Sequence, residues 1–403
     1  MPRRRTKRRI TASKPSWDFR KTSKGATFDG NVETIALVGP AHPLRGGIAQ
    51  YTDQLYLHLR KKYHVEVFTF SRLFPTFLFP GRTQFDTSAP GFAVPSRQTL
   101  DSIGPWSWRR TAVAVAEVRP LAIVLVYQMP FFAPCLGVLM RLLRSRLAAA
   151  RQILLCHNLI PHERHFFDIP LTRYVVAAPD AFLVLSASVE REVRRFRPDA
   201  EVRLVPQPIY DFFPAAPPQA IARRQLGLPP EQPLVLFFGL VRAYKGLGVL
   251  LQAMAHLPQA RLMIAGEFYQ PRADYERQIA AMALDDRVRV EDRYIPNEEV
   301  PAYFAAADVV VLPYLSATQS GVSKLAYHFD RPVVITNVGG LAEEVEEGKT
   351  GFIAPPNDPT ALAAAIGKAL AEKAHIDFAA HIREYKKRYS WDRVVEAIEA
   401  LVG

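Results

Sequence analysis

Short apolar runs alternate with segments of helical spacing through most of this chain. Ile48, Tyr51, Leu55 and Leu59, for example, recur at the interval that places them on one face of a helix. Strands that alternate with helices form parallel sheets covered by helices, so we predict an α/β protein. The predicted strands are Thr34–Val38, Val65–Phe70, Leu121–Tyr127, Gln152–Cys156, Ala181–Leu185 and Val202–Val205, followed by Leu234–Phe238, Arg261–Ala265, Val288–Val290, Val309–Leu312 and Val333–Thr336.

The strand pattern restarts after a proline-rich stretch between Gln207 and Pro230. A length of 403 residues also fits two domains, since domains usually hold ~100–200 residues. We therefore predict two doubly wound, Rossmann-like domains joined near residues 208–212. The predicted boundaries are a basic, disordered tail at 1–24, a front domain at 25–209 and a rear domain at 210–386, with a separate C-terminal segment at 387–403.

The formal charge of +12 is unevenly distributed along the chain. Residues 1–200 carry 30 Lys and Arg against 14 Asp and Glu, whereas residues 201–403 carry 21 against 25. A basic front half indicates an anionic partner, which is a membrane surface, a phosphorylated substrate or a nucleic acid. The first 24 residues hold ten cations and one anion, but they also fit a solvated tail without a partner. No nucleic-acid-binding module accompanies the charge, so we predict no nucleic-acid partner.

Two apolar stretches are candidates for membrane contact. Residues 73–81, LFPTFLFPG, read as an apolar loop, and residues 135–152 read as a basic amphipathic helix that could lie on an anionic surface. Packing in the core is the alternative for both. The apolar run 121–140 contains Pro and Gln, which favours a strand followed by a helix over a membrane span.

The remaining signals favour a cytoplasmic protein. Cys135 and Cys156 lie in apolar surroundings, as reduced core thiols do. The arginine-rich N-terminus has no apolar core behind it and so is no secretory signal. We predict a cytoplasmic location, and the inner face of the membrane is where the basic front half would bind.

Polar loops follow many of the predicted strands, and ligands of such sheets bind outside the carboxyl ends of the strands. Gly46 and Gly47 lie between a strand and a helix, where a backbone without Cβ atoms can approach a phosphate at the helix N-terminus. A plain tight turn is the alternative. Equivalent loops in both halves predict a ligand held in a central cleft.

Arg242 and Lys245 lie three positions apart in a loop that leads from a predicted strand into a helix. Two fixed cations beside free N–H groups could hold a diphosphate. The alternative is a pair of solvated surface charges. Their place directly after a buried strand favours the phosphate site.

His157 ends the buried run QILLCHN, which would direct a titratable group into the cleft. A structural histidine is the alternative. His162 and His165 follow, but no HExxH motif or cysteine at a ligand spacing supports a metal site. We therefore predict no metal.

Thr318, Gln319 and Ser320 precede a helix that is predicted to begin near Gly321. Hydroxyl groups, an amide and free N–H groups could bind an anion or a sugar hydroxyl without a charged side chain. A plain helix N-cap is the alternative. Glu343 and Glu344 lie at a further helix start, where the helix dipole favours carboxylates in any case.

From about Thr34 to Val402 the chain resembles the retaining, nucleotide-sugar-dependent glycosyltransferases of group 1, carbohydrate-active family 4. This resemblance implies the GT-B fold, in which two Rossmann-like doubly wound domains face a central cleft. Each matching motif is modest evidence alone, but their order is specific. The motifs are RGGIAQYTDQL, HNLIPHE, FFGLVRAYKGLGVLLQA, AADVVVLPY, RPVVITNVGGLAEEVEEGKTGFIAPPNDPTALAAAI and YSWDRVVEAI.

The resemblance also implies roles for individual residues. Arg242 and Lys245 would hold the diphosphate of the donor and stabilise it as the leaving group. His157 would hydrogen-bond the donor sugar, and neither a metal nor another cofactor would be needed. A helix at roughly Lys387–Gly403 would return to the front domain. Together, the predicted donor-binding residues are Gly46, Gly47, Gly239, Glu267, Thr318, Gln319, Ser320, Gly321 and Glu343.

The sequence departs from the family pattern at two glutamates that usually stand eight positions apart. Ala317 or Thr318 occupies the first position, and Leu325 or Ala326 the second. Either neutral groups bind the donor, with Glu267 or Glu343 compensating, or the donor differs from the common ones, or activity has been lost.

The expected function is transfer of a sugar from a nucleoside-diphosphate donor to a hydroxyl of a glycolipid or polysaccharide, with retention at the anomeric carbon. A sugar-nucleotide epimerase and a non-catalytic binding subunit are the alternatives.

Overall fold

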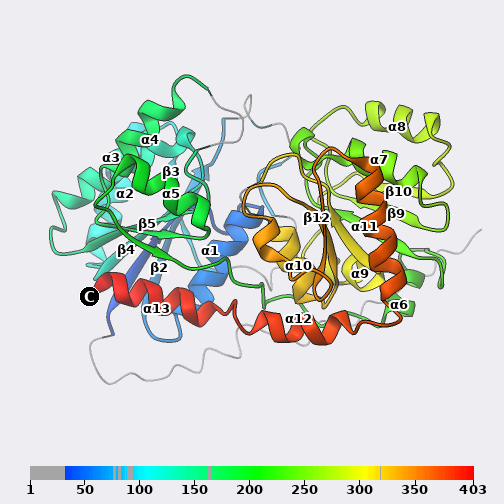
Figure 1. Ribbon diagram of the computed structural model, residues 1–403. Helices are drawn as coiled ribbons and strands as arrows, with labels where there is room; N and C mark the ends of the chain where they lie inside the picture. The colour runs from blue at the N-terminus through cyan, green and yellow to red at the C-terminus, as the bar shows by residue number, and fades with distance from the viewer. Residues whose placement is uncertain are drawn as a thin grey trace, which may run out of the picture.

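Two parallel sheets, one in each half of the chain, organise the computed structural model (Figure 1). The structure describes residues 32–75, 79, 83–86, 88, 94–160, 165–317 and 319–403. The predicted tail at 1–24, Thr318, His162 and most of the apolar loop 73–81 lie outside these ranges.

The front sheet has the strand order β3-β2-β1-β4-β5-β6-β7, and each neighbouring pair is parallel. This order reverses between β1 and β4, so a crevice opens at the carboxyl ends of these two strands. The strands are β1 Thr34–Val38, β2 His64–Arg72, β3 Arg97–Asp101, β4 Ala122–Tyr127, β5 Arg151–Cys156, β6 Ala181–Val184 and β7 Glu201–Leu204.

The rear sheet repeats this arrangement with the order β10-β9-β8-β11-β12-β13, again parallel throughout. Its strands are β8 Leu234–Phe238, β9 Arg261–Ala265, β10 Val288–Glu291, β11 Val309–Leu312, β12 Val333–Thr336 and β13 Gly351–Ala354.

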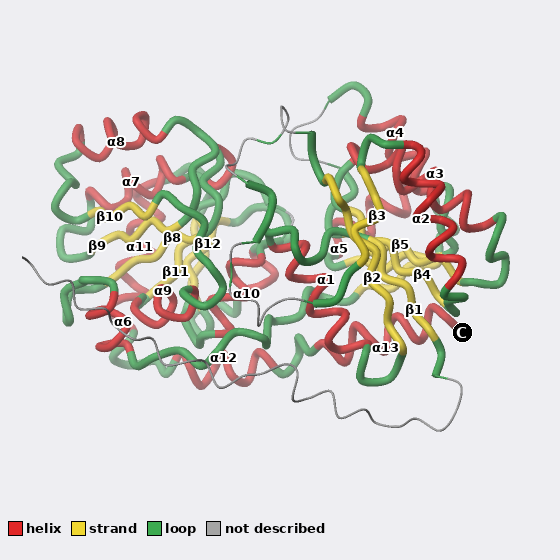
Figure 2. Tube along the Cα trace, turned by 180° about the vertical axis from the view of Figure 1, so that it is seen from behind, coloured by secondary structure: helices red, strands yellow, loops and turns green. Residues whose placement is uncertain are grey.

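Helices cover both faces of the front sheet (Figures 1 and 2). One apolar core lies between the sheet and α2 Pro105–Glu117, α3 Ala133–Arg144, α4 Asp168–Val176 and α5 Ala187–Phe196. A second core lies on the other face, where α1 Gly47–Leu59 packs. The rear sheet shares one core with the helices α6 Gln219–Gln225, α7 Leu247–Ala255, α8 Arg272–Ala281, α9 Val300–Ala306, α10 Gly321–His328, α11 Pro359–Glu372 and α12 Phe378–Lys386.

The last helix leaves the rear half and packs on the front sheet. It is α13, Trp391–Val402, which follows α12 along one side of the molecule (Figure 1). Val394 and Ile398 of α13 are buried in the core that also contains α1. Trp391 donates a hydrogen bond from Nε1 to the carbonyl of Ile209, 3.0 Å away. The chain therefore crosses between its halves twice.

The predicted α/β fold class is confirmed, and every predicted strand is present. The prediction omitted β3, which is an edge strand of the front sheet, and β13, which is an edge strand of the rear sheet. In β3 only Leu100 is buried, because an edge strand has one exposed side. Such a strand lacks the apolar run on which the prediction relied.

The basic amphipathic helix predicted at 135–152 is shorter than expected, and its apolar side packs in the core, which is the alternative that the sequence left open. The helix α3 ends at Arg144, and β5 begins at Arg151. The apolar side of α3, which includes Leu136 and Met140, is buried in the core. The apolar run 121–140 is divided into β4 and α3, as predicted. None of the helices in the described part of the chain has the length and apolar character that a membrane span requires.

Candidate active site between the two sheets

A pocket of about 440 Å³ lies between the two halves of the molecule. Its wall combines front residues such as Gly46 and Gly47 with rear residues such as Gly239 and Gly321. These glycines follow β1 and β8 or begin α10, so the pocket lies at the carboxyl ends of both sheets. This is the place that the doubly wound topology favours for a ligand.

Two cations of the rear half line this pocket, Arg242 and Lys245. The short helix η4, Ala243–Lys245, carries the lysine, whose side chain is buried. Burial, together with the smaller effect of the nearby charge of Arg242, lowers the pKa of Lys245 to about 8. A diphosphate in the pocket would reverse this effect, because it offers the buried ammonium group an opposite charge.

The backbone after η4 depends on glycine. Gly246 has a φ of +68°, and a Cβ atom at this position would lie 1.9 Å from the carbonyl oxygen of Pro313. No other residue fits without a backbone shift. This close approach holds the Arg242–Lys245 turn against the end of β11, beside the loop that leads to Ser320.

Helix N-termini from both halves meet the pocket. The helix α1 begins at Gly47, and α10 begins at Gly321 with Ser320 as its N-cap. The hydroxyl of Ser320 accepts a hydrogen bond of 3.2 Å from the N–H of Val322. These N-termini carry partial positive charge and unsatisfied N–H groups, which suit an anion.

Tyr210, from the linker between the halves, lies where these two helices meet. A Cβ atom at Gly321 would be 3.0 Å from its hydroxyl, and one at Gly47 would be 3.7 Å from it. The glycines therefore make room for the phenol at the floor of the pocket. Sequence reasoning missed Tyr210, because nothing in the proline-rich linker distinguishes it from its neighbours Phe212 and Phe213.

Glu267 lines the pocket but is already paired. Its carboxylate forms an ion pair with Arg45 from the front half, and both side chains are buried. The guanidinium of Arg45 also lies 4.9 Å from the ring centre of Tyr294. Among the lining residues that the structure describes, Glu267 is the only carboxylate, against the three cations Arg45, Arg242 and Lys245. Sequence reasoning missed Arg45, although it adjoins Gly46.

His157 lies behind the pocket wall rather than among its lining residues. The residue is 5% exposed, and its ring packs edge-on against the ring of Tyr51, with 4.7 Å between the two ring centres. Its carbonyl oxygen accepts a hydrogen bond of 3.3 Å from Nε2 of Gln319, so it touches the loop before α10. Burial lowers the pKa of His157 to about 3, which keeps the ring neutral at physiological pH. Within the described residues its Nε2 has no hydrogen-bond partner.

Glu343 does not reach the pocket. It is exposed within the short helix η5, Ala342–Glu344. Its neighbour Glu344 is buried instead, where it accepts a hydrogen bond from Ser323 and lies 3.5 Å from Nζ of Lys324. The helix start at this point serves the packing of α10, so Glu343 cannot stand in for a missing donor-binding glutamate.

Apolar side chains occupy the two positions at which the family pattern has glutamates. Ala317 and Leu325 are both buried in the pocket wall. The neutral residues Gln319 and Ser320 lie between them and also line the pocket. Thr318 itself lies outside the described residues.

Metal ligands do not gather in the described ranges, where no three side chains of His, Cys, Asp or Glu are placed to hold an ion. Cys135 and Cys156 are free, buried thiols. His162 lies outside the described residues.

Residues 232–372 match the family model described as glycosyl transferases group 1. This part of the chain is therefore similar to the group 1 glycosyl transferases. This match includes Gly239, Arg242, Lys245, Glu267 and the loop around Gln319, so the rear wall of the pocket belongs to the matched region.

Curated relatives share part of the chain. It is 35% identical over 239 residues to a D-inositol 3-phosphate glycosyltransferase of Xylanimonas cellulosilytica, covering 56% of this chain and 57% of that protein. A protein of the same name from Corynebacterium urealyticum is 31% identical over 190 residues, covering 45% of each chain. The chain spans about half the length of these curated relatives.

Solved structures match nearly the whole chain. HepE from Anabaena, in complex with UDP-glucose, aligns with a TM-score of 0.73 at 17% identity over 91% of this chain and 99% of that one. Sucrose-phosphate synthase from Thermosynechococcus elongatus aligns with a TM-score of 0.70 at 24% identity over 92% and 98%. These likenesses show the fold, and they confirm the predicted GT-B architecture.

Proposed function

We propose that this protein transfers a glycosyl group from a nucleoside-diphosphate sugar to a hydroxyl of a glycolipid or polysaccharide acceptor, with retention at the anomeric carbon. The charge of the pocket is the observation that most supports this proposal. Three cations line it, and its one described carboxylate, Glu267, is neutralised by Arg45. Such a site favours a ligand with several negative charges, as a diphosphate has.

The departing diphosphate is the group that these cations would stabilise. In the transfer, the bond between the anomeric carbon and the diphosphate oxygen breaks, while a bond to the acceptor oxygen forms and the acceptor hydroxyl loses its proton. Negative charge then builds up on the diphosphate. The groups that would stabilise this charge already line or adjoin the pocket: they are Arg242, the buried Lys245 and the N-termini of α1 and α10. Little free energy would therefore be needed to reorient them as the charge develops.

No metal enters the proposal, because fixed cations and helix N-termini would take over the neutralisation of the diphosphate. For the sugar we propose recognition by neutral groups. Gln319 and Ser320 offer an amide and a hydroxyl between the apolar Ala317 and Leu325. His157, neutral and buried behind the pocket wall, would support the Gln319 loop through its carbonyl oxygen and would not itself contact the sugar.

The names of similar proteins support a sugar-nucleotide donor. HepE was solved with UDP-glucose, and the curated relatives are named as glycosyltransferases. The apolar Ala317 and Leu325 favour one alternative, a subunit that binds a nucleotide sugar without transferring it. The test below therefore separates binding from turnover.

The test uses the purified full chain and a panel of uridine, thymidine, guanosine and adenosine diphosphate sugars. At least one donor should raise the melting temperature by a few degrees, because ligand at a hundred times its Kd stabilises the folded state by about 2.7 kcal/mol. Arg242→Ala should weaken that donor's binding at least tenfold. Arg277→Ala, an exposed change in α8 of the same rear half, is the matched control and should bind normally.

Turnover is then measured as release of free nucleoside diphosphate with candidate acceptors. Release that depends on an acceptor supports transfer, and conversion of the donor without any acceptor would indicate an epimerase. Binding without release under every condition would indicate the non-catalytic subunit. A folded protein that no donor stabilises would contradict the proposal.

A further inference from the structure

Three neighbouring helices form an outer layer on the front sheet that is strongly basic. They are α2, α3 and α4, which lie side by side on one face of the sheet (Figures 1 and 2). The segments 103–119, 128–150 and 165–178, which make up this layer, contain seven arginines, no lysine and only two acids. One of the acids, Asp168, is buried, and the other, Glu117, is exposed. Asp180, just beyond the third segment, forms an ion pair of 2.5 Å with Arg144 of the layer.

Large aromatic side chains project into solvent from the same layer. Trp106, in the first turn of α2, is 84% exposed, and Phe166, just before α4, is 94% exposed. Phe167 beside it is also exposed. Exposed apolar side chains are ordinary when they are scattered singly, but several of them on one layer mark an interaction site.

The two aromatic positions lie at the same edge of the layer. In a parallel sheet covered by helices, each helix begins at the carboxyl edge of the strands. Trp106 is at the start of α2, and Phe166 is at the start of α4, so both are at the carboxyl edge where the pocket opens. Arg109 and Arg110 follow Trp106 on α2, while Arg141 and Arg146 extend the basic surface toward the far end of α3.

We propose that the surface formed by α2, α3 and α4 docks on an anionic lipid bilayer, with Trp106 and Phe166 inserted at the headgroup level. Exposed aromatic rings prefer that level, because one part of it is apolar and another is hydrated. The arginines of the layer then contact lipid phosphates, and each cation close to an anionic surface contributes about 1 kcal/mol. The apolar face of α3 takes no part, since it is buried in the core.

Charge complementarity selects a bilayer over the other occupants. A soluble polyanion would be held by the arginines but would leave the aromatic rings in water. A second copy of this surface would bring seven arginines against seven. An anionic bilayer accepts the arginines and the aromatic rings together. Docking in this orientation would place the mouth of the pocket next to the lipid, where a lipid-borne acceptor would be presented; only that last point rests on the proposed glycosyl transfer.

The test measures whether Trp106 itself enters the bilayer. The full chain carrying Trp17→Phe is mixed with vesicles of phosphatidylcholine, or of phosphatidylcholine and phosphatidylglycerol at 7:3, that contain lipid brominated near the headgroup. Trp108 and Trp391 are buried, so the emission lost in the further variant Trp106→Phe is that of Trp106. This emission should fall at least twofold on the anionic vesicles only.

Binding is quantified by co-flotation with the same vesicles. Arg109→Glu with Arg110→Glu, and separately Trp106→Ala with Phe166→Ala, should each lower the partition coefficient at least tenfold. The matched control reverses two exposed cations of the rear half, Arg277→Glu with Lys387→Glu, and should change it less than threefold. Stabilisation by the nucleotide donor should be the same in all of these variants, which keeps failure of docking distinct from failure of the proposed activity.

Two results would overturn the proposal. The first is binding to anionic vesicles without quenching of Trp106, which would assign the attachment to the basic tail. The second is an equal loss of vesicle binding in the front and rear charge variants. That result would mean that binding depends on the net charge of the protein and not on this surface.

Discussion

Lys245 shows how a single side chain can be prepared for an anionic ligand. The fold places its ammonium group in a buried position beside another cation, Arg242, and both factors lower its pKa, with burial the larger. The group pays for this position in the free protein, since a charge is held where water is scarce. A bound diphosphate would supply the missing opposite charge, so part of its binding energy would come from relief of that cost.

This situation predicts how donor binding depends on pH. Lys245 has a pKa of about 8, so it is largely protonated at pH 7 and loses its proton as the pH rises through 8. The Kd of a nucleoside diphosphate should therefore be constant between pH 6.8 and 7.5 and rise up to tenfold for each pH unit above 8. Isothermal titration calorimetry on the full chain measures this.

Lys245→Arg is the matched variant, because a guanidinium keeps its charge across this range. Its Kd for the nucleoside diphosphate should be larger at pH 7, since the geometry differs. The Kd should then stay constant up to pH 9.5. The same pH profile in both proteins would rule out Lys245 as the titrating group at the phosphate.

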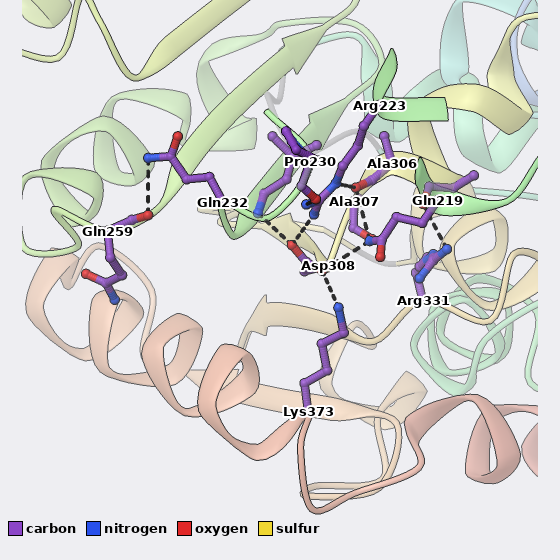
Figure 3. A network of polar contacts seen from close by, with 12 residues as sticks. Gln219, Arg223, Pro230, Gln232, Gln259, Ala306, Ala307, Asp308, Arg331 and Lys373 are labelled. Carbon is purple, nitrogen blue, oxygen red and sulfur yellow. Dashed lines mark hydrogen bonds and ion pairs between the residues drawn. The ribbon is translucent and has the colours of Figure 1, made fainter. Parts of the chain in front are cut away.

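Asp308 joins four elements of the rear half at the start of β11 (Figure 3). Its buried carboxylate accepts hydrogen bonds from Arg223 of α6 at 2.6 Å, from the N–H of Leu234 in β8 at 2.7 Å and from Lys373 after α11 at 2.5 Å. Burial alone would raise the pKa of Asp308, but these three donors outweigh it and lower the pKa below its usual value. The network therefore stabilises the fold above about pH 4 and is lost as the pH falls through the lowered pKa.

Replacing this carboxylate should destabilise the rear half strongly. Asp308→Asn leaves the buried guanidinium of Arg223 without its counter-charge, and we expect a loss of about 3–5 kcal/mol in the free energy of unfolding. Urea unfolding followed by circular dichroism measures it. Lys373→Met is the control, because half of the lysine side chain is exposed and its loss should cost less than about 1 kcal/mol. Equal effects of the two changes would contradict this account.

The two halves of the molecule are held together around the pocket by polar contacts. Besides the Arg45–Glu267 ion pair, Gln50 donates to Asn297 at 2.7 Å, and the N–H of Asn297 donates to Ser88 at 2.9 Å. Front and rear residues thus share a seam that includes one wall of the pocket. Glycosyl transfer in such a cleft would require the seam to hold the two halves in register.

The ion pair across this seam should show energetic coupling. Arg45→Met and Glu267→Gln should each lower stability, because each leaves a buried charge without its partner. The double variant should be less destabilised than the sum of the two by about 1–3 kcal/mol, as thermal or urea unfolding would show. Asp274→Asn with Arg277→Met, an exposed pair at 2.6 Å, is the control and should show no measurable coupling. Additive effects at Arg45 and Glu267 would mean that the pair does not join the halves.

The sequence alone determined the parallel α/β architecture and the two central sheets. Buried parallel strands are continuous apolar runs, and that pattern is local, so it can be recognised without knowing the fold. The same local logic found Gly46, Gly47, Arg242, Lys245 and Gln319, since each directly follows a strand or begins a helix. It did not find the edge strand β3, in which only Leu100 is buried, or the edge strand β13, which has only four residues although three of them are buried.

Only the tertiary structure decided how charges and apolar faces are partnered. It paired Glu267 with Arg45, more than two hundred residues away, and placed Tyr210 between two helix N-termini. It buried the apolar side of α3 in the core and left Trp106 and Phe166 exposed on the same layer. A sequence shows which side chains are apolar or charged. Which of them meet depends on how distant segments pack, because burial and pairing are set by neighbours in space.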